Sequence, residues 1–369
     1  MKFQSTADAL REALHHTQPV TTKHSSLPVL AQTLFIIQKD SVVVRTTNLS
    51  IGVEYRISAK TEGEGSFACS GALLQDIIAG AVADEIITIE QSGNLITFST
   101  EHQQSTIKTV PHDDFPALPK IEQANQFLVS AQDLSHTIKS VIYAASSSDI
   151  KPEISSVYMY SDQGNIVMVA TDSFRLAEKK LLIPNLPDIT GCMIPVKNAA
   201  HIMRSCADMK DTSITIQISP TQITFSTSSW YCVSRLVDGN YPDYRQIIPT
   251  ESSTKMVLLR SDIMNALRTL NLFADTFQQV DISIDPTTKT CSMIAENVEI
   301  GRTTIQIPAA LSGENIETRC NGRYLQDCMG ALSADSVCIG FVAPNKPITV
   351  RPVGDDDFLY LVMPMHRTS

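Results

Sequence analysis

The residues of this chain whose side chains could support catalysis are few, and their spacing fits no common catalytic pattern. His15 and His16 are adjacent in a predicted helix, where neighbouring side chains point about 100° apart, so we expect a solvated pair and no shared ligand face. Cys232 follows Trp230 and Tyr231 in a strand-like run without a nearby base, which favours a buried thiol over a nucleophile. The sequence contains no P-loop, GxSxG or HExxH motif, so we predict a protein that is not an enzyme.

The cysteines do not suggest a metal site either. They form no CxxC pair and no Cys/His cluster at zinc spacing, so we expect small buried side chains in a reducing compartment and no cofactor. Residues 1–5 lack the apolar core of a signal peptide, and no stretch approaches the roughly 20 apolar residues of a membrane span, which predicts a cytoplasmic protein without membrane association. The eight cysteines are Cys69, Cys192, Cys206, Cys232, Cys291, Cys320, Cys328 and Cys338.

Length and charge set further limits on the function. A chain of 369 residues is too long for one ordinary core and suggests two or three domains, of which three is the better prediction. The 39 acidic and 29 basic residues give a formal charge of −10, which argues against binding nucleic acid through a broad basic surface.

A repeated pattern of residue types predicts the elements that carry these side chains. Phe3, Phe127 and Met256 each begin a short predicted strand, and the copies are about 125 residues apart. Each strand is followed by two apolar residues four apart, which share one helix face. These pairs are Leu10/Leu14, Leu134/Ile138 and Ile263/Leu267.

A second helix recurs in each copy, and segments rich in β-branched residues lie between and after the helices. Ser70 and Asn321 suit N-caps and Pro195 suits a first turn, so the six helices are predicted at about 7–18, 70–81, 131–147, 196–210, 260–275 and 321–332. The strands are predicted near 41–46, 85–89, 95–99, 165–170, 213–218, 222–227 and 281–284. Each copy therefore has an α+β fold with two helices and antiparallel sheet.

Such a unit leaves sheet edges free, and pairing edges between copies would cover them. Three copies in a row would form an arc, and two arcs could close head to tail into a ring. We predict domain limits at 1–122, 126–250 and 254–369, with polar links near 122–125 and 250–254.

Local motifs add to the repeat and make the whole chain resemble the bacterial DNA polymerase III β subunit, the sliding clamp family. The two strongest matches are Arg235-Leu-Val-Asp-Gly-Asn-Tyr-Pro-Asp-Tyr-Arg245 and Val362-Met-Pro-Met365, supported by Ala170-Thr-Asp-Ser-Phe-Arg-Leu-Ala177 and the weaker Leu27-Pro-Val-Leu30. The resemblance implies a homodimeric six-domain ring that encircles double-stranded DNA. It also implies a processivity factor that a clamp loader places on DNA and that tethers the replicative polymerase and other replication and repair proteins.

The resemblance also implies a hydrophobic groove that binds a short peptide of a partner protein. Arg175 and the backbone at the rim would orient the peptide, while the alternative is that Asp172 caps its own turn and Arg175 forms an intramolecular ion pair. Methionines there would adapt to different ligands. The predicted groove residues are Ile154, Thr171, Ser173, Phe174, Arg175, Leu176, Pro242, Gln246, Ile247, Pro347, Leu361, Val362, Met363, Pro364 and Met365.

Encirclement does not require a basic protein, and the predicted helices together carry no net charge. His15, Lys139 and Arg268 occupy one equivalent position on the first helices, and Lys197 and Arg323 another on the second. We expect weak, salt-sensitive phosphate contact from such cations, and the alternative is that they are simply solvated. The predicted DNA-facing residues are Lys23, His24, Lys139, Lys197, Arg204, Arg268 and Arg323.

Some positions depart from the family pattern. Ser173-Phe174 stands where the family commonly has Gly-His, Gln246 stands where a second arginine is frequent, and the chain continues past Met365. A bulky Phe174 could narrow the pocket, and Gln246 removes a cation from its rim. The rival interpretation is a peptide-binding scaffold that never encircles DNA, and only ring closure distinguishes the two.

Overall fold

The structure is a computed structural model that describes residues 1–22, 27–121, 125–209 and 212–365. Contacts within the chain divide it into two compact units, unit 1 with residues 1–132 and 201–236 and unit 2 with residues 133–200 and 237–369. Within the described ranges there are six α-helices, and none of them has the length and apolar content that crossing a membrane requires.

Each predicted repeat begins with the expected strand and helix. Phe3, Phe127 and Met256 are buried in β1 (Lys2–Thr6), β10 (Asn125–Ser130) and β18 (Thr254–Leu259). These strands lead directly into α1 (Ala7–Thr17), α3 (Ala131–Ile142) and α5 (Arg260–Phe273). The apolar pairs predicted to share a helix face are all buried, so the periodicity identified the face of each helix that packs on the core.

The second helices are α2 (Gly71–Ile78), α4 (Val196–Asp208) and α6 (Gly322–Ala331). The predicted N-caps are confirmed, because the Ser70 hydroxyl accepts from the Leu73 amide and the side-chain oxygen Oδ1 of Asn321 accepts from the amides of Arg323 and Tyr324. Pro195 lies one residue before α4 and ends β14. The predicted extension of the third helix to residue 147 is wrong: α3 ends at Ile142, before a serine-rich run whose hydroxyls and amides bond locally.

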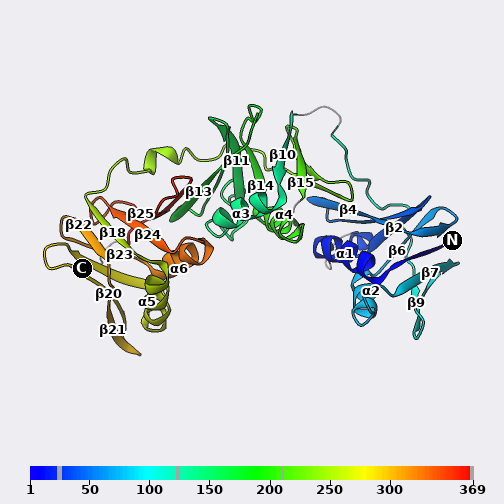
Figure 1. Cartoon of the computed structure of the whole chain (residues 1–369), viewed down its shortest axis with the longest axis horizontal. Coiled ribbons are helices and arrows are strands. Elements are labelled where there is room, and N and C mark those ends of the chain that lie inside the picture. The colour runs from blue at the N-terminus through cyan, green and yellow to red at the C-terminus, as the bar shows by residue number, and fades with distance from the viewer. Residues whose placement is uncertain (23–26, 122–124, 210–211, 366–369) are drawn as a thin grey trace. The chain divides into compact units, whose positions relative to one another are not determined.

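The described part of unit 1 holds a five-stranded sheet in the order β5-β1-β7-β8-β9 and an eight-stranded sheet in the order β10-β15-β16-β17-β4-β3-β2-β6. Helices α1 and α2 lie next to each other, and α1 packs on β3 and β4 (Figure 1). The remaining strands here are β2 (Thr33–Gln38), β3 (Ser41–Thr47), β4 (Ile51–Ser58), β5 (Lys60–Glu62), β6 (Gly65–Cys69), β7 (Ile86–Ser92), β8 (Leu95–Ser99), β9 (Gln104–Lys108), β15 (Ser213–Ile218), β16 (Gln222–Ser226) and β17 (Trp230–Arg235).

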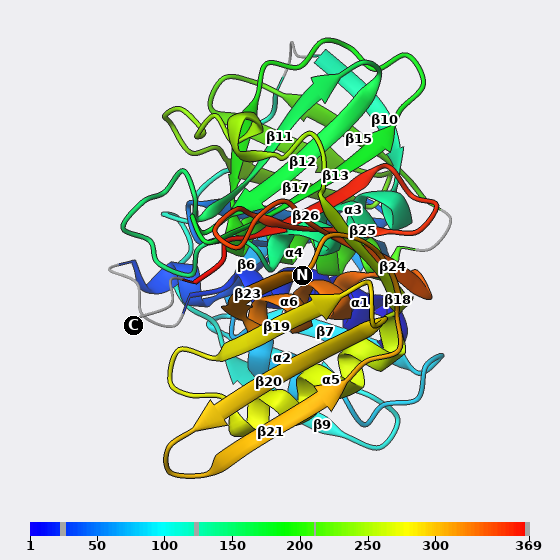
Figure 2. The ribbon, with the colours of Figure 1, turned by 90° about the vertical axis from the view of Figure 1, so that its left-hand side faces the viewer.

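The described part of unit 2 holds a nine-stranded sheet in the order β14-β11-β12-β13-β26-β25-β24-β18-β22 and a four-stranded sheet in the order β21-β20-β19-β23. In Figure 2, β19, β20 and β21 lie side by side in front of α5. The strands are β11 (Ser156–Asp162), β12 (Asn165–Thr171), β13 (Arg175–Leu182), β14 (Cys192–Pro195), β19 (Gln279–Asp285), β20 (Thr290–Asn297), β21 (Gly301–Gln306), β22 (Ala310–Gly313), β23 (Ile316–Asn321), β24 (Ser336–Phe341), β25 (Ile348–Pro352) and β26 (Phe358–Val362).

The predicted pairing of edges between successive repeats is confirmed at two places. In unit 1, β17 of the second repeat pairs antiparallel with β4 of the first, with Trp230 opposite Tyr55. In unit 2, β13 of the second repeat pairs antiparallel with β26 of the third, with Arg175 opposite Val362. Each pairing extends one sheet across two repeats, so an edge that a single repeat would expose is covered.

Candidate docking pocket

The floor of an apolar pocket is set by strand register in unit 2. Thr171 on β12 lies opposite Leu176 on β13, and Leu176 lies opposite Leu361 on β26. Residues directly opposite in an antiparallel sheet share a face, so these three side chains form one row across three strands. All three are buried, and β13 and β26 bring together segments 185 residues apart in the chain, since residues 176 and 361 are direct partners.

Besides Ile154, which precedes β11, the walls of the pocket come from three short segments around this row. They are the β12–β13 turn, the segment that includes the 3₁₀ turn η3 (Arg245–Ile247), and the residue after β26, Met363. The cavity has a volume of about 150 Å³. It is lined by Ile154, Thr171, Ser173, Phe174, Arg175, Leu176, Pro242, Asp243, Tyr244, Ile247, Leu361 and Met363, all within unit 2.

A buried hydrogen-bond chain fixes the wall that carries Tyr244. The Tyr244 hydroxyl donates to the Glu178 carboxylate at 2.5 Å and lies 2.6 Å from the Tyr160 hydroxyl. Arg245 donates to the Tyr160 hydroxyl at 3.0 Å. Burial and the bonded Glu178 carboxylate raise the pKa of Tyr244 far above its ordinary value, so the phenol stays protonated and remains a donor. These hydrogen bonds therefore hold the segment that carries Tyr244 in place, while the ring of Tyr244 lines the apolar pocket.

The β12–β13 turn is held by its own aspartate. The Asp172 carboxylate accepts from the amides of Phe174 and Arg175, both at 2.9 Å. Ser173 has φ +79°, a left-handed conformation that costs a residue with a Cβ energy that glycine does not lose. Phe174 is 62% exposed, and its carbonyl accepts from the Met363 amide at 2.8 Å. The turn thus presents an aromatic side chain at the pocket rim.

The guanidinium of Arg175 forms ion pairs and an aromatic contact with residues of the same chain. Its guanidinium lies 2.9 Å from Asp172 and 2.6 Å from Asp327 and stacks 4.3 Å from the centre of the Tyr324 ring. Burial by itself would lower the pKa of Arg175, but the two carboxylates more than offset this and raise it. The alternative weighed from the sequence, a capped turn with an intramolecular ion pair, therefore describes Asp172 and Arg175, and Arg175 still lines the pocket.

Ten of the fifteen predicted groove residues line this pocket, and five lie elsewhere among the described residues. Val362 faces the opposite side of β26 from Leu361 and is fully buried, and Pro347 is also buried. Gln246 is exposed and bonds to Asp243 at 2.6 Å. Asp243 and Tyr244 were missed, although both belong to the 235–245 motif and flank Pro242 and Ile247.

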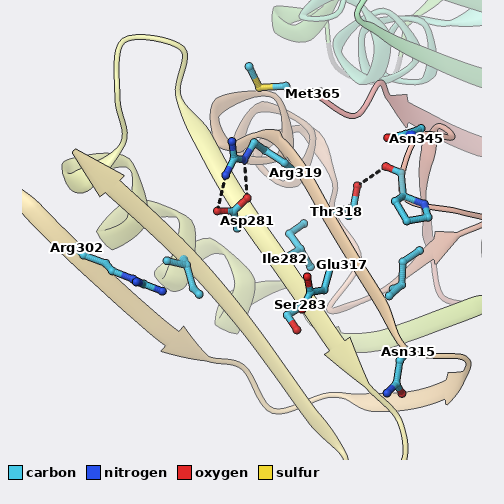
Figure 3. Close-up of a pocket in the computed structure, with 13 residues that line it drawn as sticks. Asp281, Ile282, Ser283, Arg302, Asn315, Glu317, Thr318, Arg319, Asn345 and Met365 are labelled. Atoms are coloured by element: carbon cyan, nitrogen blue, oxygen red, sulfur yellow. Dashed lines mark hydrogen bonds and ion pairs between the residues drawn. The ribbon is translucent and has the colours of Figure 1, made fainter. Parts of the chain in front are cut away.

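Met365 lies at a different, polar cavity of about 510 Å³ on the four-stranded sheet, and Pro364 precedes it. The Met365 amide donates to the Arg319 carbonyl at 2.8 Å. Figure 3 shows Arg319 next to Met365 and joined to Asp281 by two contacts, of 2.6 and 2.9 Å. This cavity presents charges that are already paired, so the apolar pocket is the better candidate for a side-chain anchor.

Five of the seven predicted DNA-facing residues lie in the described part of the chain. Lys139, Lys197, Arg204, Arg268 and Arg323 are all exposed on helices, and Lys23 and His24 lie outside the described residues. The Lys197 ammonium pairs with Asp149 at 2.8 Å. The repeat equivalence holds in the structure, since Lys139 and Arg268 are both the ninth residue of their helix.

The cysteines and the two adjacent histidines differ in burial. Seven of the eight cysteines are buried, and burial raises the pKa of the Cys232 thiol well above its ordinary value. The prediction of a solvated histidine pair is right for His15 but wrong for His16, which is 2% exposed and stacks on Tyr55 at 5.1 Å. Among the described residues, no group of three His, Cys, Asp or Glu side chains is arranged to hold a metal ion.

Three family models match successive parts of the chain. They are described as the DNA polymerase III beta subunit N-terminal domain, matching residues 1–119, the central domain, matching 128–243, and the C-terminal domain, matching 245–366. The matches occur in chain order and leave only short segments unmatched.

Full-length relatives and solved structures agree with these models. The chain is 26% identical to the beta sliding clamp of Synechococcus elongatus over 100% of both chains, and 24% identical to that of Staphylococcus epidermidis over 99% of both. It matches the crystal structure of the DNA polymerase III beta subunit from Thermotoga maritima with a TM-score of 0.94 at 22% identity over 100% of both chains. The Bacillus subtilis sliding clamp structure matches with a TM-score of 0.92 at 23% identity, over 100% of this chain and 99% of that one.

Proposed function

Because the chain belongs to the DNA polymerase III β subunit family, the bacterial sliding clamps, we propose that it is a DNA polymerase processivity factor that works as a ring-shaped homodimer. Two chains encircle double-stranded DNA, a clamp loader places the ring, and the replicative polymerase docks on it. Other replication and repair proteins share the same docking pocket. The protein acts in the cytoplasm, needs no cofactor and catalyses no reaction itself.

The 150 Å³ pocket is the observation that carries the docking role. A ligand pocket for a drug-sized molecule usually has 300–1,000 Å³, whereas a cavity of about 150 Å³ holds a group of the size of benzene. The pocket therefore suits one apolar side chain of a peptide. Leu176 and Leu361 of its floor belong to a packed cluster with Val167 and Val169, so this part of the site is preformed.

Two of the sheet edges suit ring closure. β9 in unit 1 and β21 in unit 2 are among the described strands that have one neighbour, so each offers unpaired backbone groups. Apolar side chains are exposed near these edges, including Leu95 on β8 and Val298 and Ile300 before β21. We expect β9 of one chain to pair with β21 of the other at both junctions, which covers these two edges.

Solution mass tests this closure. Light scattering at micromolar concentration should give twice the 40.4 kDa chain mass, and imaging of the same sample should show an open centre. Ile300→Asp should lower the mass toward that of one chain, whereas Leu182→Asp, at a 70% exposed position on β13, should not. A compact monomer without a hole would favour the alternative, a peptide-binding scaffold that does not encircle DNA.

A ring that encircles DNA is linked to it without tight contacts, and this agrees with the way charge is distributed along the chain. The six helices contain seven acidic and seven basic residues, so the formal charge of −10 lies outside them. Exposed cations such as Lys139 and Arg268 would meet phosphates weakly and in a salt-dependent way. Protein loaded on nicked circular DNA should stay bound and should dissociate once the circle is linearised. Equal retention on both forms would contradict encirclement.

A further inference from the structure

The β3–β4 turn of unit 1 has the same geometry as the β12–β13 turn at the rim of the unit 2 pocket. Leu49 and Ser173 occupy equivalent positions and have φ +72° and +79°. The side-chain oxygen of Asn48 accepts from the amides two and three residues later, at 3.0 and 2.9 Å, and Asp172 accepts from the equivalent amides, both at 2.9 Å. The internal repeat therefore reproduces this turn, hydrogen bond for hydrogen bond.

The strands below this turn also correspond, with Gly52 in the place of Leu176. Gly52 lies opposite Thr47 on β3 and Val233 on β17, as Leu176 lies opposite its partners on β12 and β26. A Cβ at Gly52 would clash with the side chain of Leu118. Leu118 therefore fills, from another segment, the space that a floor side chain at position 52 would take.

A cavity of about 190 Å³ lies at this place in unit 1, close to the 150 Å³ of the unit 2 pocket. It is enclosed by the β3–β4 turn, by β17 and by segment 116–119, all within unit 1. Its apolar lining includes Leu49, Ile51, Leu118 and Val233. A cavity of this size has room for one apolar side chain, so unit 1 contains a second pocket of the same kind.

Arg235 distinguishes the two pockets. Its amide donates to the Ser50 carbonyl at 2.8 Å, as the Met363 amide donates to the Phe174 carbonyl, so a guanidinium stands where the unit 2 pocket has a thioether. Arg235 is exposed and is the one charged side chain among the described residues that line the cavity.

The guanidinium of Arg235 forms no ion pair with another described residue. The charged residues of segment 111–121 are Asp113, Asp114 and Lys120, which are exposed and do not line the cavity. A guanidinium offers parallel N–H donors that match a carboxylate. The mouth of an apolar pocket therefore carries a group that can bind an acidic side chain.

We propose that the unit 1 cavity is a second docking site, and that it takes a peptide whose apolar anchor is flanked by an acidic residue. The apolar side chain enters the cavity, and the carboxylate pairs with Arg235. The proposal rests on the proposed docking function, because the unit 2 pocket is its structural precedent, and it adds a site and the chemistry of its ligand.

The test uses the full-length protein and a decapeptide of serine and glycine that carries one photoreactive leucine followed by aspartate. After irradiation, mass spectrometry of the digested protein identifies the segments that carry cross-linked peptide. We expect cross-links at the unit 1 cavity, in segment 116–119 or the β3–β4 turn, and at the unit 2 pocket. Asparagine in place of the aspartate should lower labelling in unit 1 about threefold at subsaturating peptide, because one exposed charge pair is lost.

Two pairs of variants separate the apolar contact from the charge. Leu49→Asn removes an apolar wall but keeps a residue that tolerates the left-handed turn, so it should lower labelling in unit 1 and leave unit 2 unchanged. Leu73→Asn, on α2 at a similar exposure of 47% against 45%, should change neither. Arg235→Gln should abolish the preference for aspartate over asparagine, whereas Lys39→Gln, which removes an exposed cation of unit 1 away from the cavity, should not.

Labelling at the unit 2 pocket alone would overturn the proposal. Unit 1 labelling that persists in Leu49→Asn, or a preference for aspartate that persists in Arg235→Gln, would overturn it as well. Labelling at neither pocket would refute the proposed docking function together with the proposal.

Discussion

Removing the Tyr244 hydroxyl tests how the pocket wall is held. Tyr244 is 6% exposed and Glu178 is 9% exposed, so Tyr244→Phe leaves a buried carboxylate without this donor. A hydrogen bond to a charged group contributes about 1.5–3 kcal/mol. We take about 2 kcal/mol for this site, which corresponds to a roughly 30-fold change in the local opening equilibrium.

Amide hydrogen exchange measured by mass spectrometry reports the local opening equilibrium of individual strands. Amides of β13 and β26, which flank the pocket, should exchange about 30-fold faster in Tyr244→Phe, since exchange follows the opening equilibrium. Amides of β17 in unit 1 provide the internal control and should not change. Peptide affinity should fall as well, because Tyr244 lines the pocket.

A double substitution separates the lost bond from simple misfolding. Tyr244→Phe combined with Glu178→Met removes both polar partners and keeps their approximate volumes, so much of the protection should return. If Tyr244→Phe changes exchange in β13 and β26 by less than threefold, the Glu178–Tyr244 bond does not anchor this wall and the reasoning is refuted.

Three further predictions concern strain, protonation and the pocket itself. Ser173→Gly should stabilise the protein by about 0.5 kcal/mol, because relief of the left-handed φ of +79° exceeds the extra unfolded-state entropy of glycine; a lower melting temperature would contradict this. His201 is 4% exposed, and burial lowers its pKa to about 4. The unfolded chain therefore takes up this proton first as pH falls from about 7, and stability should decrease by up to about 3 kcal/mol by pH 4. Urea titrations of wild type and His201→Gln should show that the variant loses part of this decrease. Met363→Asp should weaken peptide binding more than tenfold without changing solution mass, and unchanged affinity would place the anchor elsewhere.

The sequence predicted the elements well where burial imposes a period. Leu10 and Leu14 identify the inward face of α1, and Ser70 and Asn321 mark helix starts because their side chains satisfy free amides. The same helical period also indicates that His16 is buried, because it lies three residues after buried Ala13 and so on the same side of the helix.

The candidate site was predicted less completely, because its membership depends on strand parity and turn geometry. Leu361 and Val362 are equally apolar in sequence, but only the register of β26 against β13 shows which one faces the pocket. Tyr244 contributes because a 3₁₀ turn follows it and its hydroxyl reaches Glu178, a contact between residues 66 apart. Neither fact follows from periodicity.

Substitutions in the floor of this pocket and in its exposed turns should have different effects. Thr171, Leu176 and Leu361 are cross-strand partners inside a packed sheet, so a change of shape there disturbs β12, β13 and β26 together. Phe174 and Gln246 lie in exposed turns, where a substitution alters charge and contact area without moving a strand. We therefore expect affinity for an apolar anchor to depend on the packed strands, and preference among partners to depend on the exposed turns.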